Sequence, residues 1–185
     1  MARVAPAAGT LHRQAQVELD RQLAAHGRVT QMKQTLAHSP RALLALMEWY
    51  PLRDEVAAFL GERATTLFAH AVSTQADCLI CSTFFRRVLI DAGEDPDTLR
   101  LDARELALVE FGRALARDNA RVPDAAYRPV AAFLDASQLV ALTAFGAMMI
   151  ATNIFNNALE VELDEYLYRY RRAGPDTGPP YKEKP

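Results

Sequence analysis

The chain has 185 residues with a formal net charge of −2, and its hydrophobic and charged shares are those of an ordinary globular domain. This length fits one domain with a sizeable core, and the charge gives no attraction to nucleic acid or to an anionic membrane. Alanine and leucine are plentiful and runs of β-branched residues are scarce, which favours helix throughout.

The first elements are short helices. Apolar residues at helical spacing predict a helix over residues 11–26 that ends at Gly27. A shorter helical piece is expected over residues 30–38. We treat residues 1–34 as a helical extension that precedes the main domain.

A helix with clear boundary signals comes next. Ser39 and Pro40 form an N-cap and first helical residue, and the helix is expected to reach Tyr50. Pro51 should break or kink it, since proline removes a backbone hydrogen bond. The segment 54–60 would then continue the helical path.

A helix over residues 62–74, a polar link and a second helix follow. In this prediction Asp77 caps the second helix, which begins at Cys78 and runs to Gly93. The sequence from Asp102 to Glu105 has the form of a capping box and predicts a helix that ends near residue 119.

The C-terminal part combines an apolar helix with a polar tail. Pro123 is expected to start a helix that ends at residue 134, and Asp135 to cap the uncharged run 136–159. This run is long enough to span a membrane, but its serine, threonine, glutamine and asparagine side chains would lack partners in lipid. We therefore expect a buried core or interface helix that continues to Arg171 or Arg172, and a disordered tail over residues 173–185.

The only two cysteines, Cys78 and Cys81, are three positions apart. Residues 1–10 do not have the form of a secretory signal peptide, so a cytoplasmic location is expected. There, such a pair is more often redox-active, catalytic or metal-binding than a structural disulfide. In the first turn of a helix, free N–H groups favour a thiolate, although the carboxylate of Asp77 opposes it.

Two other interpretations of the cysteines remain open. Both could be inert core residues, because cysteine is often buried. A zinc site would need two more ligands, and none of the four histidines has the spacing of a zinc finger. We expect no metal and no cofactor.

Four segments carry a resemblance to a known family. They are residues 38–44, 67–81, 101–108 and 153–164. Together they resemble the AhpD-like, alkylhydroperoxidase branch of the carboxymuconolactone decarboxylase family, over about residues 35–165. The resemblance implies an all-α, orthogonal helical bundle over residues 35–172, and assembly as a homo-oligomer.

The family's proton relay uses a glutamate twelve residues before the first cysteine and a histidine four after the second. Here these positions are Thr66 and Phe85, so that relay is absent. His70 is one helical turn after Thr66 and could act as the general base instead, or could be a satisfied core histidine. Glu62 is a second candidate base, with a solvated surface glutamate as the alternative.

Three functions are compatible with these residues. By resemblance, Cys81 would attack a hydroperoxide, Cys78 would resolve the sulfenic acid, and a dithiol would reduce the disulfide, although helix-end electrostatics favour Cys78 as the attacking thiol. A carboxymuconolactone decarboxylase-like enzyme would need a base such as His70 and no cysteine, and would act on a small carboxylated substrate. The third possibility is a redox sensor that has lost the relay.

Other polar side chains are expected to serve packing. Asn153, Asn156 and Asn157 would fix helix packing or a subunit interface rather than bind substrate. The tyrosines at 166, 168 and 170 are expected in a surface or oligomer contact.

Overall fold

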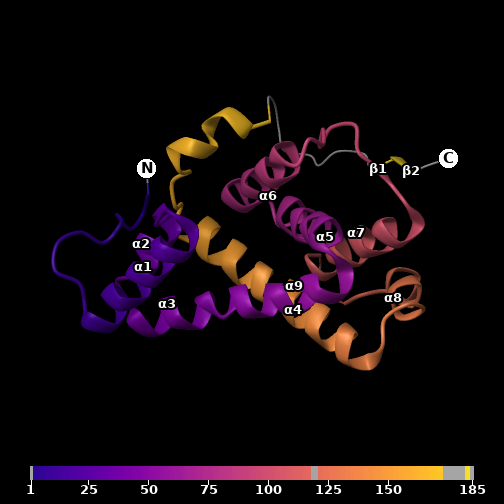
Figure 1. Ribbon diagram of the computed structural model, residues 1–185, viewed down its shortest axis with the longest axis horizontal. Helices are drawn as coiled ribbons and strands as arrows, with labels where there is room; N and C mark the ends of the chain where they lie inside the picture. Colours follow the sequence, from indigo (N-terminus) through magenta and orange to yellow (C-terminus); the bar gives the residue numbers. More distant parts are fainter. Residues whose placement is uncertain (1, 118–120, 173–181, 184–185) are drawn as a thin grey trace.

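The computed structural model describes residues 2–117, 121–172 and 182–183. Its elements are almost all helical, which confirms the all-α prediction (Figure 1). The elements are α1 (Arg13–His26), α2 (Gln31–Leu36), α3 (Pro40–Met47), α4 (Trp49–Leu60), α5 (Glu62–Gln75), α6 (Leu79–Asp91), β1 (Arg100–Leu101), α7 (Ala103–Leu115), α8 (Asp124–Ala131), α9 (Ala136–Ala158), the 3₁₀ helix η2 (Glu165–Tyr170) and β2 (Lys182–Glu183).

Helix α5 is the centre of the bundle and packs against α4, α6, α7 and α9. Its Phe68 is completely buried, with its ring 6.3 Å from that of Phe111 on α7 and 5.9 Å from that of Phe145 on α9. A Cβ atom on Gly146 would lie 2.7 Å from Leu115 Cδ1 and 3.0 Å from the Phe68 ring. The absent side chain at Gly146 therefore lets α9 approach α5 and α7 closely.

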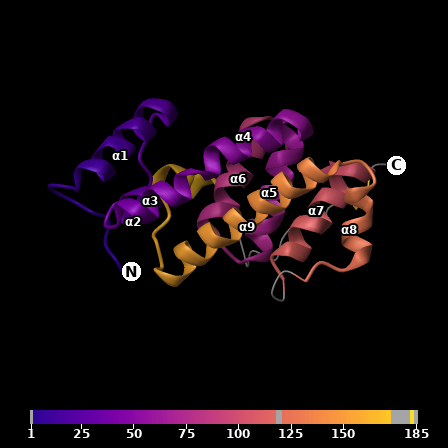
Figure 2. The same ribbon diagram turned by 90° about the horizontal axis from the view of Figure 1, so that it is seen from below.

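Helix α9 is long and apolar enough to cross a membrane by length and composition alone. In the structure one face of it packs against α4, α5 and α7, while Val140 and Ile154 on its other side are exposed. Figure 2 shows α9 crossing the molecule from the side of α8 to the side of α2 and α3. It is thus a core helix along one face, and it connects the main core to the N-terminal helices.

The N-terminal helices form a second core with α3. Ala15 and Leu19 of α1 pack with Leu36, Leu43 and Met47. Residues 1–34, expected as an extension, therefore pack directly on the main domain.

The predicted capping signals at Gly27, Ser39, Asp102 and Asp135 are confirmed. Ser39 accepts a hydrogen bond from the N–H of Ala42, and Gly27 ends α1 in a left-handed conformation at φ 70°. Asp102 and Asp135 each complete a capping box, with Glu105 and Gln138 respectively. These helix starts depend on hydrogen bonds within one turn, which is why the sequence alone identifies them.

Two predicted boundaries near helix ends are wrong. The break expected at Pro51 lies at Glu48, and Pro51 belongs to the first turn of α4, where a missing N–H costs little. Helix α7 ends at Leu115, earlier than the predicted end near residue 119.

The predicted continuation of α9 to Arg172 is also wrong. Helix α9 ends at Ala158, Glu160 adopts a positive φ of 51°, and the chain turns back into η2. As a result Tyr170 is buried and its hydroxyl donates to Asp91, while Tyr168 is the one exposed tyrosine of the three. Tyr170 is therefore not a surface residue as predicted, and an oligomer contact at Tyr168 stays a prediction.

The predicted tail over residues 173–185 lies mostly outside the described residues. The exception is the pair Lys182 and Glu183, which forms β2 and pairs in parallel with Arg100 and Leu101. The backbone of these two residues is thus paired with β1, and disorder of the tail stays a prediction.

Candidate functional site

The cysteines lie at the turn between α5 and α6. Asp77 has a left-handed φ of 50°, and the Cys78 N–H reaches back to the carbonyl of Ser73 at 3.0 Å. This hydrogen-bond pattern ends α5 and leaves Cys78, not Asp77, as the N-cap of α6. The predicted cap at Asp77 is therefore wrong. Asp77 instead occupies the left-handed position of the turn, a conformation that aspartate tolerates.

Both cysteines are buried free thiols that share one hydrogen-bond donor. The side-chain amide of Asn156 donates to Cys81 Sγ at 3.4 Å and to Cys78 Sγ at 3.8 Å. Its neighbour Asn157 donates to the backbone carbonyls of Ala76 and Asp77. The end of α9 therefore holds both the sulfurs and the turn that carries them, as expected for asparagines that fix helix packing, and Asn156 does so through the sulfurs themselves.

The two thiols have opposite electrostatics. The Cys81 thiol donates to Cys78, and this contact, with backbone N–H groups of Cys81 and Ile80 and the Asn156 amide, lowers the pKa of Cys78 against the effect of burial. The same contact raises the pKa of Cys81 well above its ordinary value, with burial and the Cys78 charge adding to the effect. When the pair loses one proton, the negative charge therefore falls on Cys78 rather than on Cys81.

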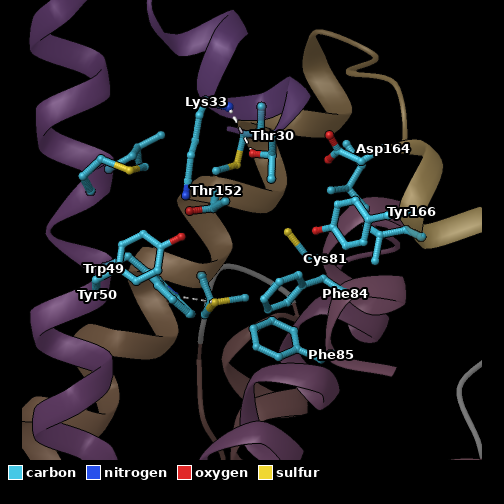
Figure 3. Close-up of a pocket in the computed structure, with 16 residues that line it drawn as sticks. Thr30, Lys33, Trp49, Tyr50, Cys81, Phe84, Phe85, Thr152, Asp164 and Tyr166 are labelled. Carbon is cyan, nitrogen blue, oxygen red and sulfur yellow. Dashed lines mark hydrogen bonds between the residues drawn. The ribbon is translucent and has the colours of Figure 1, made fainter. Parts of the chain in front are cut away.

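Cys81 lines a cavity of about 90 Å³, shown in Figure 3. Trp49, Phe84 and Phe85 provide aromatic walls, and the Trp49 indole N–H donates to the sulfur of Met149 at 2.8 Å. Cys78 is not among the residues that line this cavity. The cavity therefore places apolar walls around the Cys81 sulfur and leaves room for a small molecule.

Polar side chains line the same cavity, away from the aromatic walls. They are Thr30, Lys33, Tyr50, Thr152, Asp164 and Tyr166. Burial lowers the pKa of Lys33 to about 8 and raises that of Tyr50 to about 12. Burial also raises the pKa values of Asp164 and Tyr166. Sequence reasoning missed these residues, because they come from α2, α4, α9 and the η2 segment, which meet only in the folded chain.

The structure does not bring His70 into the cavity lining. His70 is buried on α5. Its role as a general base stays a prediction without support from the cavity geometry. Glu62 forms an ion pair with Arg53 and its side chain is 74% exposed, as expected for a surface glutamate.

The two relay positions that the family resemblance implies line one cleft. Thr66 and Phe85 are both in the lining of a cleft of about 700 Å³, which shares Trp49, Phe84 and Phe85 with the cavity. The Thr66 hydroxyl donates to the carbonyl of Glu62 at 2.8 Å. Neither residue can serve as a base at these positions.

Metal ligation has no support in residues 2–117, 121–172 and 182–183. No group of three histidine, cysteine, aspartate or glutamate side chains gathers there as a metal site would need. The cysteines are therefore best considered as thiols.

Replacement of Asn156 by leucine is expected to raise the pKa of the Cys78 thiol, because it removes a donor that stabilises the thiolate. The rise should be about one pKa unit, as expected for loss of one hydrogen bond to a charged group. The ultraviolet absorbance of the thiolate during a pH titration measures it. Asn157→Leu is the matched control, since Asn157 binds the turn but neither sulfur. An equal shift in both variants would contradict a direct role of Asn156.

Comparison with known proteins gives matches to solved structures only. No family model and no curated protein matches the chain. An uncharacterised peroxidase-related protein from Silicibacter sp. TM1040 is 17% identical, with a TM-score of 0.66 over 89% of this chain and 92% of that one. A structure described as an alkylhydroperoxidase AhpD core, a peroxidase-related protein from Ralstonia eutropha JMP134, is 15% identical, with a TM-score of 0.64 over 85% of this chain and 89% of that one. The chain therefore has the AhpD-like helical fold.

Proposed function

We propose that the chain is a thiol-dependent peroxidase or disulfide oxidoreductase in which Cys78 and Cys81 alternate between dithiol and disulfide. The observation that carries this proposal is the Cys81 sulfur at the wall of a small apolar cavity, with Cys78 hydrogen-bonded behind it. The fold is also that of proteins described as peroxidase-related. A hydroperoxide is the substrate and an external dithiol the reductant.

In the first step Cys78 replaces the missing relay as the proton carrier. Its thiolate accepts the proton of the Cys81 thiol through the hydrogen bond between them. The Cys81 thiolate then attacks the terminal oxygen of the hydroperoxide, and the O–O bond breaks. Cys78 passes the proton to the departing alkoxide, which leaves as the alcohol, and Cys81 becomes a sulfenic acid.

In the second step Cys78, again a thiolate, attacks the sulfur of the Cys81 sulfenic acid. The S–O bond breaks, hydroxide leaves as water with a proton from solvent, and a disulfide closes. An external dithiol returns two electrons and two protons by thiol–disulfide exchange. Over one cycle the hydroperoxide is reduced to alcohol and water, and the dithiol is oxidised.

We also infer that the protein works as a homo-oligomer in the cytoplasm. Val140 and Ile154 are 69% and 62% exposed on α9, and a second copy could cover this apolar face. A reducing compartment would keep the two cysteines as the dithiol that reacts with peroxide.

One equivalent of a small organic hydroperoxide is expected to remove both free thiols and lower the intact mass by two hydrogens. A dithiol should restore both thiols. Intact mass spectrometry and a free-thiol count, before and after each addition, measure the change. Thiols that persist unchanged would contradict the proposal.

The two alternatives give different results in the same assay. Slow oxidation without turnover in the presence of a dithiol would indicate a redox sensor. Conversion of a small carboxylated substrate by a Cys78→Ser/Cys81→Ser double variant would indicate cysteine-independent acid–base chemistry.

A further inference from the structure

Lys33 is a buried cation that the proposed reaction does not use. It is 2% exposed, and its side chain extends from α2 toward Thr152 and Tyr50 in the cavity that Cys81 also lines (Figure 3). Its Nζ lies over the Tyr50 ring, 5.0 Å from the ring centroid. Among the described residues, no carboxylate forms a salt bridge with this ammonium group.

The acidic groups around Lys33 already have other partners. Glu18 accepts hydrogen bonds from Arg21 and from Gln22. Asp164, across the cavity in Figure 3, accepts the N–H of Gln31 at 2.9 Å. The Tyr50 and Tyr166 hydroxyls remain neutral at physiological pH, because burial raises the pKa of each.

An ammonium group buried without a paired anion is costly, and an anionic ligand would relieve that cost. We propose that the cavity selects a small substrate with a carboxylate at one end. The Lys33 ammonium binds this carboxylate, and the reactive oxygen of the substrate then lies at the Cys81 sulfur. This inference rests on the proposed peroxidase function and adds the chemical class of its substrate.

The lining of the cavity fits such a molecule from end to end. The Thr30 hydroxyl accepts the backbone N–H of Lys33 and keeps its own hydrogen to donate to a carboxylate, and the aromatic walls near Cys81 suit an apolar body. The volume of about 90 Å³ is below the roughly 150 Å³ of an engineered cavity that holds benzene. The body of the substrate therefore has only a few carbon atoms.

Alkylation of Cys81 tests this site without any peroxide turnover, so its result is independent of the proposed function. Iodoacetate and iodoacetamide differ only in the charge at one end. In a Cys78→Ser background, which leaves Cys81 as the sole thiol, Lys33→Met is expected to slow iodoacetate about tenfold and iodoacetamide less than about twofold. Arg41→Met, which removes a cation from the exposed surface of α3, is the matched control and should change neither rate.

The ratio of the two rates separates recognition of the reagent from activation of the sulfur. A change in the thiolate content of Cys81 alters both alkylation rates equally, whereas loss of a carboxylate-binding site alters only the rate with iodoacetate. An equal fall with both reagents, or no fall, would overturn the proposal. If Lys33→Met does not fold, the same alkylation rates are measured in the Cys78→Ser protein that retains Lys33, with a small competitor added. Trimethylacetate should then slow alkylation in a saturable way and trimethylacetamide should not, and equal protection by both would overturn the proposal.

Discussion

Cys81→Ser is expected to lower hydroperoxide turnover by at least about a thousandfold, the size of loss that follows removal of a catalytic nucleophile. The reason is access, since Cys81 lines the cavity and Cys78 does not. Cys78→Ser should react with peroxide once and more slowly, because it lacks the thiolate that takes the Cys81 proton, and should then stop, because no second thiol remains to close the disulfide. Consumption of hydroperoxide with a dithiol present measures turnover.

A sulfenic-acid trap followed by peptide mass spectrometry assigns the roles of the two cysteines. A trapped adduct is expected at Cys81 in the Cys78→Ser variant. The reverse pattern, an adduct at Cys78 in the Cys81→Ser variant, would show that the lower pKa of Cys78 decides the attack and that access does not. Full turnover in either variant would remove the dithiol mechanism.

Phe68→Ala is expected to lower the free energy of unfolding by about 3–5 kcal/mol, the usual range for truncation of a fully buried phenylalanine. Phe68 contacts α7 and α9 through Phe111 and Phe145, and its ring fits against the bare backbone of Gly146. Alanine at this position would leave a cavity. The surrounding helices cannot move in to fill it, because each is held by contacts on its other sides. Urea unfolding followed by circular dichroism measures the loss.

Tyr127→Ala is the matched control for that experiment. Tyr127 is an aromatic residue on α8 that is 43% exposed, so its removal should change stability by only about 0.5 kcal/mol or less. Similar losses in both variants would mean that the α5 core does not dominate stability. A smaller loss at Phe68 than at Tyr127 would contradict the packing described here.

Cys81 shares its cavity with residues at the N-terminal helices. Lys33 and Thr30 lie within the segment that the sequence suggests is only an extension, yet both line the space next to Cys81. The second core, in which Leu36 packs with Leu43 and Met47, fixes the position of α2 and hence of Lys33. Loss of this packing would therefore open the cavity as well as destabilise the fold.

The sequence by itself determined the helical class, the AhpD-like fold and most helix starts. Ser39, Asp102 and Asp135 were identified because each cap depends on hydrogen bonds within one turn. The spacing of Cys78 and Cys81 likewise placed both sulfurs on one helical turn. Such features depend on residues close in sequence, so local chemistry is enough to predict them.

Only the tertiary structure decided the chemistry around the sulfurs. Asn156 lies 75 positions from Cys81, and Lys33 and Asp164 approach the cavity from opposite ends of the chain. His70 was a reasonable choice from helical spacing, but the direction of its side chain depends on how α5 packs against its neighbours. Contacts of this kind form because buried polar groups from distant helices meet in one apolar space, and no local pattern records where those helices will cross.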